Sequence, residues 1–180
     1  MPFAVLLLFD ANTEAVIKST WKELADTGVA PYMDQSANRP HFTLAVYQGL
    51  DLVRCEQQLK LFAATKNPLP VALQYLGIFP TTPATVFISA PVTSPLLELH
   101  AQIHESLRAI SVDAHPYYLP GKWIPHCTLA LELEPSLITR VLGVALQIPV
   151  PLHGEITEIG VIEFRPVRHL FRFRLGDTIG

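Results

Sequence analysis

The sequence predicts an α+β fold of two similar lobes, each an antiparallel sheet with helices packed outside it, around a central cleft. Two observations support this prediction. The order helix, strand, helix, strand, strand occurs in both halves of the chain, and the segment Pro40–Ala45 (PHFTLA) returns as Pro125–Ala130 (PHCTLA) with one difference. We therefore expect 1–180 to form a single bilobal domain with approximate lobe halves 1–91 and 92–180.

The elements of the first half follow from the spacing of apolar residues. The continuous apolar run Phe3–Phe9 predicts a strand, and Asp10 or Asn12 can cap a helix that Gly28 ends. A loop, a strand, a helix and a strand pair are predicted next, at Pro31–Pro40, His41–Tyr47, Asp51–Thr65, Val71–Ile78 and Thr85–Ala90.

The second half repeats this order after a helix that Ser94 opens, with Pro95 at its favoured first position. A loop, a strand, a helix and two closing strands are predicted at Val112–Lys122, His126–Leu131, Pro135–Leu146, Val150–Phe164 and His169–Leu175.

Composition indicates a packed globular protein, because 49% of the residues are hydrophobic and 16% are charged. The net charge of −3 disfavours binding of an extended nucleic acid duplex, whereas a small phosphate ligand in a local pocket is compatible with it. The N-terminal apolar run reaches Asp10 too soon to span a membrane and lacks the basic start of a signal peptide. We expect a cytoplasmic monomer with no membrane attachment, in which Cys55 and Cys127 are buried thiols.

The repeated segment places the same polar pair on each predicted strand. Residues i and i+2 of a strand point to one face, so His41 and Thr43 share a face, as do His126 and Thr128. If an approximate twofold axis relates the lobes, the two polar faces meet across the cleft. The alternate residues are expected in the helix-packed core: Phe42, Leu44, Cys127 and Leu129.

Two imidazoles and two hydroxyls are suited to phosphodiester cleavage. In-line attack on phosphorus needs a base for the nucleophile and an acid for the leaving oxygen. Imidazole titrates near neutral pH and can fill either role, while threonine hydroxyls can donate to the non-bridging oxygens. The scheme requires no metal ion and no cofactor.

At these residues the chain resembles the 2H phosphoesterases, which include 2′-5′ RNA ligase-like proteins and 2′,3′-cyclic nucleotide phosphodiesterases. The resemblance rests on Arg39–Leu44 (RPHFTL) and Trp123–Ala130 (WIPHCTLA). It implies a bilobal fold, metal-independent action on 2′,3′-cyclic or 2′,5′-linked phosphates, and catalytic roles for the two histidines and two threonines. Leu131 and Glu132 stand where ligase-like members often carry a basic residue, which favours a mononucleotide or a short RNA end as substrate.

Alternatives to a hydrolase stay open from the sequence. A module that binds nucleotides without turnover, a protein-interaction domain with a vestigial cleft, and an enzyme that ligates RNA ends are all compatible with the motifs. The two histidines could also be hydrogen-bonded strand residues of an inactive core. Which histidine would be the acid is not determined by the sequence.

Three further residues are candidates for substrate contacts. Tyr118 and Lys122 lie on the loop before the second motif, where they could border the cleft. Arginines gather near the C-terminus, either as a solvated row or with one of them on the phosphate, for which Arg168 is the candidate. This group consists of Arg165, Arg168, Arg172 and Arg174.

His100 and His104 have the i, i+4 spacing of metal ligands on a helix. No third ligand is evident near them in the sequence. We therefore expect no metal site there.

Overall fold

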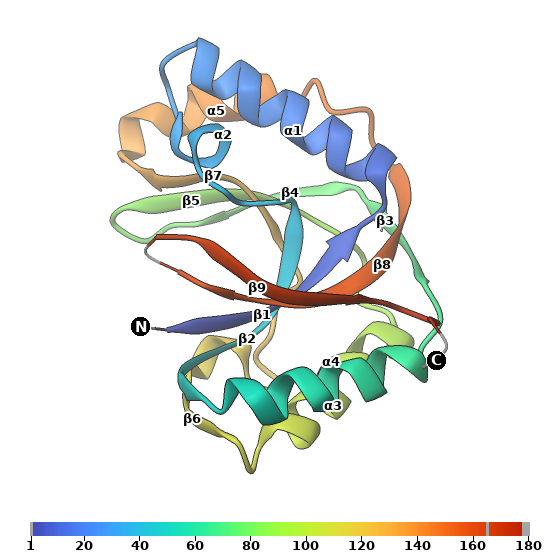
Figure 1. Cartoon of the computed structure of the whole chain (residues 1–180). Coiled ribbons are helices and arrows are strands. Elements are labelled where there is room, and N and C mark those ends of the chain that lie inside the picture. The colour runs from blue at the N-terminus through green and yellow to red at the C-terminus, as the bar shows by residue number, and fades with distance from the viewer. Residues whose placement is uncertain (1, 165, 178–180) are drawn as a thin grey trace.

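The computed structural model describes residues 2–164 and 166–177, which form the predicted α+β fold with two antiparallel sheets (Figure 1). The strands are β1 (Phe3–Phe9), β2 (His41–Leu50), β3 (Leu69–Leu73), β4 (Tyr75–Phe79), β5 (Ala84–Ser89), β6 (Ser111–Ala114), β7 (Cys127–Leu133), β8 (Leu152–Glu163) and β9 (Arg168–Arg174). The α-helices are α1 (Ala11–Asp26), α2 (Tyr32–Gln35), α3 (Leu52–Ala64), α4 (Ser94–Leu107) and α5 (Ile138–Ala145). Two short 3₁₀ helices cover Pro116–Tyr118 and Pro135–Leu137.

The larger sheet has six strands and the smaller has three. The larger runs β3-β8-β1-β2-β6, with β9 also paired to β8, and the smaller runs β4-β5-β7. Each sheet takes strands from both halves of the chain, because β6, β8 and β9 join β1 to β3 while β7 joins β4 and β5. The sheets therefore do not coincide with the halves of the chain, and the division into 1–91 and 92–180 stays a prediction.

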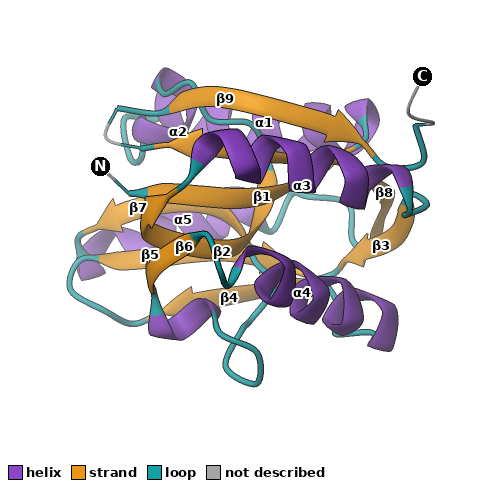
Figure 2. Cartoon of the chain, turned by 60° about the horizontal axis from the view of Figure 1, so that its bottom comes forward, coloured by secondary structure: helices purple, strands orange, loops and turns teal. Residues whose placement is uncertain are grey.

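Helices α3 and α4 lie on one face of the larger sheet, at the bottom of Figure 1 and at the front of Figure 2. Their apolar stripes form the main core with β1, through Cys55 and Leu59 of α3, Leu99 and Ile103 of α4, and Leu7. Helices α1 and α5 pack with the smaller sheet in a second cluster. Both sheets consequently carry their helices on the outside.

The first helix begins and ends where the sequence predicts. Asp10 is the N-cap, and its carboxylate accepts hydrogen bonds from the backbone N–H groups of Asn12 and Thr13, both within 3.0 Å. Helix α1 ends at Asp26, and Gly28 follows with a φ of 69°, a left-handed conformation that glycine adopts without strain.

Three predicted segments differ from the structure. The prediction of one strand over Val71–Ile78 is wrong, because the chain leaves the larger sheet after β3 and enters the smaller one at β4. At the junction, the backbone N–H of Gln74 donates to the carbonyl of Ser89 at 2.9 Å, a contact far away in sequence. The predicted loop Pro31–Pro40 contains α2, and the predicted loop Val112–Lys122 contains most of strand β6, which pairs with β2, and a 3₁₀ helix.

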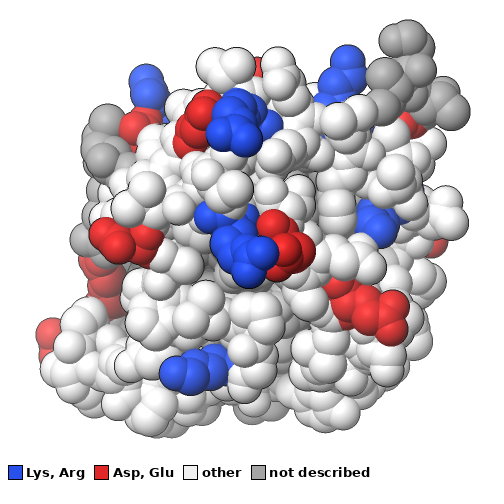
Figure 3. Space-filling model, turned by 90° about the horizontal axis from the view of Figure 1, so that it is seen from below, with Lys and Arg blue, Asp and Glu red and all other residues white. Residues whose placement is uncertain are grey.

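The face seen from below is weakly charged. Acidic and basic side chains are interspersed there among many uncharged ones, without a broad patch of either sign (Figure 3). Over residues 2–164 and 166–177, no helix is both long and apolar enough to span a bilayer. Both cysteines are buried free thiols, as expected.

Candidate active site

The two motifs lie on strands that are buried on one side. His41 and Thr43 belong to β2, Thr128 belongs to β7, and His126 directly precedes β7. All four of these side chains are partly exposed. The residues that alternate with them are fully buried, each with 0% exposure: Phe42, Leu44, Cys127 and Leu129.

Each histidine ring is held in the same way. The Nδ1 atom of His41 donates to the backbone carbonyl of Arg39 at 2.5 Å, and Nδ1 of His126 donates to the carbonyl of Ile124 at 2.7 Å. Because a carbonyl oxygen can only accept, the proton of each neutral ring lies on Nδ1 and the lone pair on Nε2. Both Nε2 atoms are thereby prepared to exchange a proton.

The motifs contact each other directly. Strand β2 contacts β7, the backbone of His41 lies beside the thiol of Cys127, the residue after His126, and burial raises the pKa of that thiol to about 12. The positive charge of protonated His126 also lowers the pKa of His41, so the two rings are close enough to interact electrostatically. The structure thus places the two predicted histidines near each other, on contacting strands.

Both tryptophans of the chain connect one half to the motif of the other half. The indole Nε1 of Trp123 donates to the backbone carbonyl of Thr43 at 2.8 Å. The indole Nε1 of Trp21 donates to the carbonyl of Thr128 at 3.0 Å. The first bond ties the segment before β7 to β2, and the second ties α1 to β7; neither was predicted from the sequence.

His100 and His104 tie α4 to the first motif strand. Nε2 of each ring donates to the carbonyl of Leu44 at 3.1 Å, and Nε2 of His100 also donates to the carbonyl of Tyr118 at 2.8 Å. The His100 ring stacks on Trp123 with 4.3 Å between centroids, and burial lowers its pKa to about 4. In the described part of the chain no three potential metal ligands come together.

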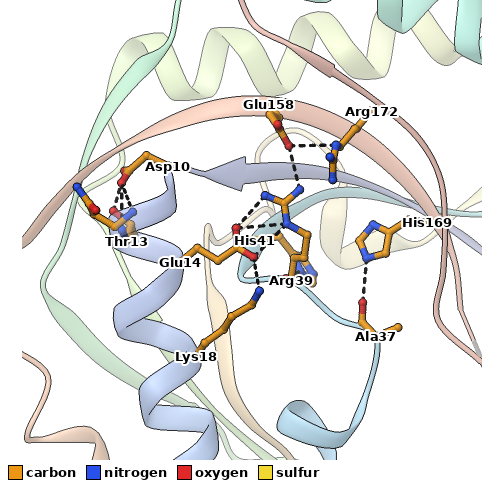
Figure 4. Close-up of polar contacts among 11 residues, drawn as sticks. Asp10, Thr13, Glu14, Lys18, Ala37, Arg39, His41, Glu158, His169 and Arg172 are labelled. Carbon is orange, nitrogen blue, oxygen red and sulfur yellow. Dashed lines mark hydrogen bonds and ion pairs between the residues drawn. The ribbon is translucent and has the colours of Figure 1, made fainter.

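An ion-pair network surrounds the carbonyl that holds His41. The guanidinium of Arg39 donates from Nε and Nη2 to Glu14 at 3.0 and 2.8 Å, and from Nη1 to Glu158 at 2.9 Å (Figure 4). Lys18 also pairs with Glu14, at 2.7 Å. Helix α1 and strand β8 therefore anchor the segment that orients His41, and all three guanidinium nitrogens of Arg39 are engaged in this anchor.

Both histidines favour the neutral form in the unliganded protein. Burial, together with the charges of His126 and His169, lowers the pKa of His41 to about 4. Burial also lowers the pKa of His126. The Nε2 atom of His169 donates to the carbonyl of Ala37 at 2.9 Å, in the loop before β2 (Figure 4).

The neighbours of His126 are aromatic rather than charged. Its ring meets Phe79 edge-on at 4.9 Å between centroids, Phe87 at 5.4 Å and Tyr118 at 6.3 Å. A side chain at Gly77 would collide with the Phe87 ring, so glycine allows this ring to lie against β4. Neither phenylalanine was singled out from the sequence, because apolar residues in predicted strands give no signal beyond a core role.

The remaining predicted contact residues differ in position. Tyr118 lies beside His126, whereas Lys122 is exposed on the loop before the motif. The structure does not bring Arg168 to the histidines, because its guanidinium pairs with Glu163 at 2.5 Å. Arg165 lies outside the described residues.

A groove of about 550 Å³ lies away from the histidines. Its walls come from β3, β8 and the segment before α4. None of the predicted site residues lines this groove.

The fold and the two His-x-Thr motifs are consistent with the class of two-histidine phosphoesterases. The chain belongs to the 2′-5′ RNA ligase superfamily, whose family model matches residues 15–167. This is a superfamily of phosphoesterases and RNA ligases, so membership supports an enzyme.

Solved structures share the fold. The protein TT0787 of Thermus thermophilus matches with a TM-score of 0.64 and 17% identity over 98% of both chains. Apo LigT of E. coli matches with a TM-score of 0.61 and 17% identity, also over 98% of both chains. A structure described as a phosphoesterase matches with a TM-score of 0.60 and 19% identity over 97% of this chain and 98% of its own. No curated protein sequence matches the chain.

Proposed function

We propose that this protein is a metal-independent phosphodiesterase that hydrolyses 2′,3′-cyclic phosphates of nucleotides or RNA ends, or 2′,5′ linkages. His41 and His126 act as general base and general acid, and Thr43 and Thr128 bind the phosphate. The observation that carries the proposal is the matched pair of rings: both have Nδ1 bound to a carbonyl and Nε2 available, on strands that contact each other.

The proposed reaction is an in-line displacement at phosphorus. Nε2 of the neutral histidine takes a proton from water, whose oxygen forms the new P–O bond. The bond to the 2′ or 3′ oxygen breaks, and Nε2 of the protonated histidine gives that oxygen its proton. The threonine hydroxyls donate to the non-bridging oxygens, where negative charge develops.

The pKa values support one assignment of the two roles. The pKa of His41 is about 4, while the pKa of His126 is lowered less strongly. The first proton taken up by the free protein therefore goes to His126. In hydrolysis we assign the base to His41 and the acid to His126, and ligation of a cyclic phosphate would use the same roles with a 5′-hydroxyl in place of water.

A nucleotide is the proposed ligand. One structure of E. coli LigT was solved as a complex with 3′-AMP. In this chain, the rings of Phe79 and Tyr118 beside His126 offer apolar surface on which a base can stack. Because both motifs come from one chain, the site needs no second copy, and we propose a monomer. The buried free thiols support the cytoplasm as its location.

Phosphorus NMR of the purified protein tests the proposal. The protein is incubated with 2′,3′-cyclic nucleotides and 2′,5′-linked dinucleotides, with and without EDTA. A new phosphomonoester signal that EDTA leaves unchanged is the expected result, and its chemical shift identifies the 2′ or 3′ product. Saturable nucleotide binding without any product would instead support a binding module, and neither binding nor product would support an interaction domain. A new diester formed from cyclic-phosphate and 5′-hydroxyl RNA ends would identify a ligase.

A further inference from the structure

The sheet face that carries the first motif extends across four strands to β9. Residues opposite one another in paired strands point to the same face of a sheet. One row of partners starts at the motif histidine, and it runs His41, Leu8, Glu158, Arg174. The neighbouring row starts at the motif threonine, and it runs Thr43, Leu6, Gly160, Arg172. Two arginines thus lie on the face of the first motif.

The charges on this face do not balance. The carboxylate of Glu158 is already bound by Arg39 at 2.9 Å, and its contact with Nε of Arg172 is 3.7 Å. Arg39 is 21% exposed, whereas Arg172 is 59% exposed, so the second guanidinium is open to a ligand. Arg174 is exposed on the same face and adds positive charge.

In the row that runs from Thr43 to Arg172, the position before Arg172 is Gly160, which has no side chain. A Cβ there would lie 3.0 Å from the carbonyl oxygen of Phe171 and 3.2 Å from Cβ of Arg172. Gly160 and Leu6 are both buried, whereas Arg172 is exposed, so the part of this row that an anion can reach is its Arg172 end. Figure 4 shows Arg172 near Arg39, His41 and His169 on this side of the sheet.

The spacing separates Arg172 from the reacting phosphorus. Three strand intervals of about 4.8 Å place its Cα about 14 Å from that of Thr43. An extended arginine spans only part of this distance, so the anion that it binds is a different group from the phosphate held by the histidines. A nucleotide chain carries such a group on a neighbouring linkage.

Resting on the proposed function, we propose that Arg172 and Arg174 form a second anion subsite, which binds a phosphate next to the reacting one. A guanidinium is suited to this, because its planar donors match two phosphate oxygens. After the second motif the chain has Leu131 and Glu132 and therefore no basic residue. The two arginines of β9 supply positive charge from the other sheet instead. Substrates with a second phosphate are therefore preferred over cyclic mononucleotides.

The test compares two substrates with the same reacting end. One is a 2′,3′-cyclic mononucleotide, and the other is a trinucleotide that ends in the same cyclic phosphate. The wild-type protein is expected to have the higher kcat/KM for the trinucleotide. Arg172→Ala is expected to lower the ratio of the two kcat/KM values by about tenfold, and added salt to lower the wild-type ratio. Arg54→Ala, which removes the same charge from an exposed position of α3, should leave the ratio unchanged.

Binding of the fluorescently labelled trinucleotide separates this inference from the proposed function. If the wild-type protein binds it without cleaving either substrate, and Arg172→Ala weakens that binding about tenfold, the subsite stands and the hydrolase is contradicted. If Arg172→Ala changes neither the ratio nor the affinity, or lowers kcat/KM equally for both substrates, the subsite is contradicted. Melting curves of the variants exclude a loss through unfolding.

Discussion

The two motif strands use one device to orient their histidines but place them in different surroundings. In both, Nδ1 donates to the carbonyl two residues earlier and Nε2 is left for chemistry. Around His41 the neighbours are polar, with the charged pair Arg39 and Glu158 and the ring of His169 on one face of the larger sheet. Around His126 they are aromatic rings.

This difference shows how two copies of one motif can bind a substrate whose two sides differ. A nucleotide has a charged backbone and an apolar base, and the chain offers charged groups near one histidine and rings near the other. Under the proposed function, the two Nε2 atoms would carry out the proton transfers, while the different surroundings would orient the substrate. Variants that change the surroundings of only one histidine test whether this difference matters.

Removing either histidine gives the largest expected effect. His41→Ala and His126→Ala should each lower kcat by roughly 10² to 10⁴, the usual contribution of one general acid or base. Single-turnover rates with a cyclic nucleotide measure the loss. His153→Ala, at an exposed position of β8, serves as the control. If either motif variant kept the wild-type rate, the replaced histidine would not be a general acid or base of the reaction.

The pH profile of kcat/KM tests the assignment of the two roles. The base His41 is neutral above its pKa of about 4, and the acid His126 loses its proton above a pKa that burial keeps below 6.5. The profile should peak on the acidic side of pH 6.5 and fall about tenfold per unit at higher pH. An optimum above pH 7 would show that the acid has a raised pKa instead.

The ion-pair network near His41 should matter more for stability than the matching position near His126. Arg39→Met leaves the carboxylates of Glu14 and Glu158, 11% and 18% exposed, without their shared partner. We expect it to lower the free energy of unfolding by about 2 kcal/mol and to reduce kcat through His41. Ile124→Ala, at the corresponding place, is 49% exposed and should change stability by less than about 0.5 kcal/mol. Urea titrations compare the two, and equal effects would contradict the difference between the motifs.

The smallest expected effect concerns His100, which bonds to the carbonyl of Leu44 in β2 and stacks on Trp123 before β7. The pKa of His100 is about 4 in the folded protein and 6.5 without the fold, so the unfolded chain binds more protons between these values. Stability contributed by the neutral ring is present above pH 6.5 and is lost as the pH falls toward 4. This group alone should cost about 1 kcal/mol at pH 5.5 relative to pH 7.5. Urea titrations at both pH values should show that the free energy of unfolding differs less between them in His100→Gln than in the wild-type protein. An equal difference in both proteins would show that another group causes the pH dependence.

The motif strands could be predicted from the sequence because their signals are local. Alternation of polar and apolar residues placed His41 and Thr43 on one face, and the caps of α1 followed from Asp10 and Gly28. The split between β3 and β4 was missed because Gln74 sits within a continuous apolar run, and only its bond to the distant Ser89 marks the change of sheet.

The surroundings of the site depend on pairings that no local pattern reveals. Arg39 is adjacent to the first motif, but its partners Glu14 and Glu158 are 25 and 119 residues away. Arg168 was preferred over Arg172 because it lies nearer the turn. The β8–β9 register shifts between Val161 and Ile162, and Arg168 lies opposite Glu163 and forms an ion pair with it.

Nitrogen-15 NMR of the histidine rings, recorded while a nucleoside 3′-monophosphate is added, tests most directly whether the two motifs form one phosphate site. Without ligand at pH 7.5, both motif rings should be neutral with the proton on Nδ1. Both Nε2 signals should then shift along a single binding curve as the phosphate reaches them together. A response from one ring only, or two curves with different midpoints, would show that the histidines do not share a phosphate.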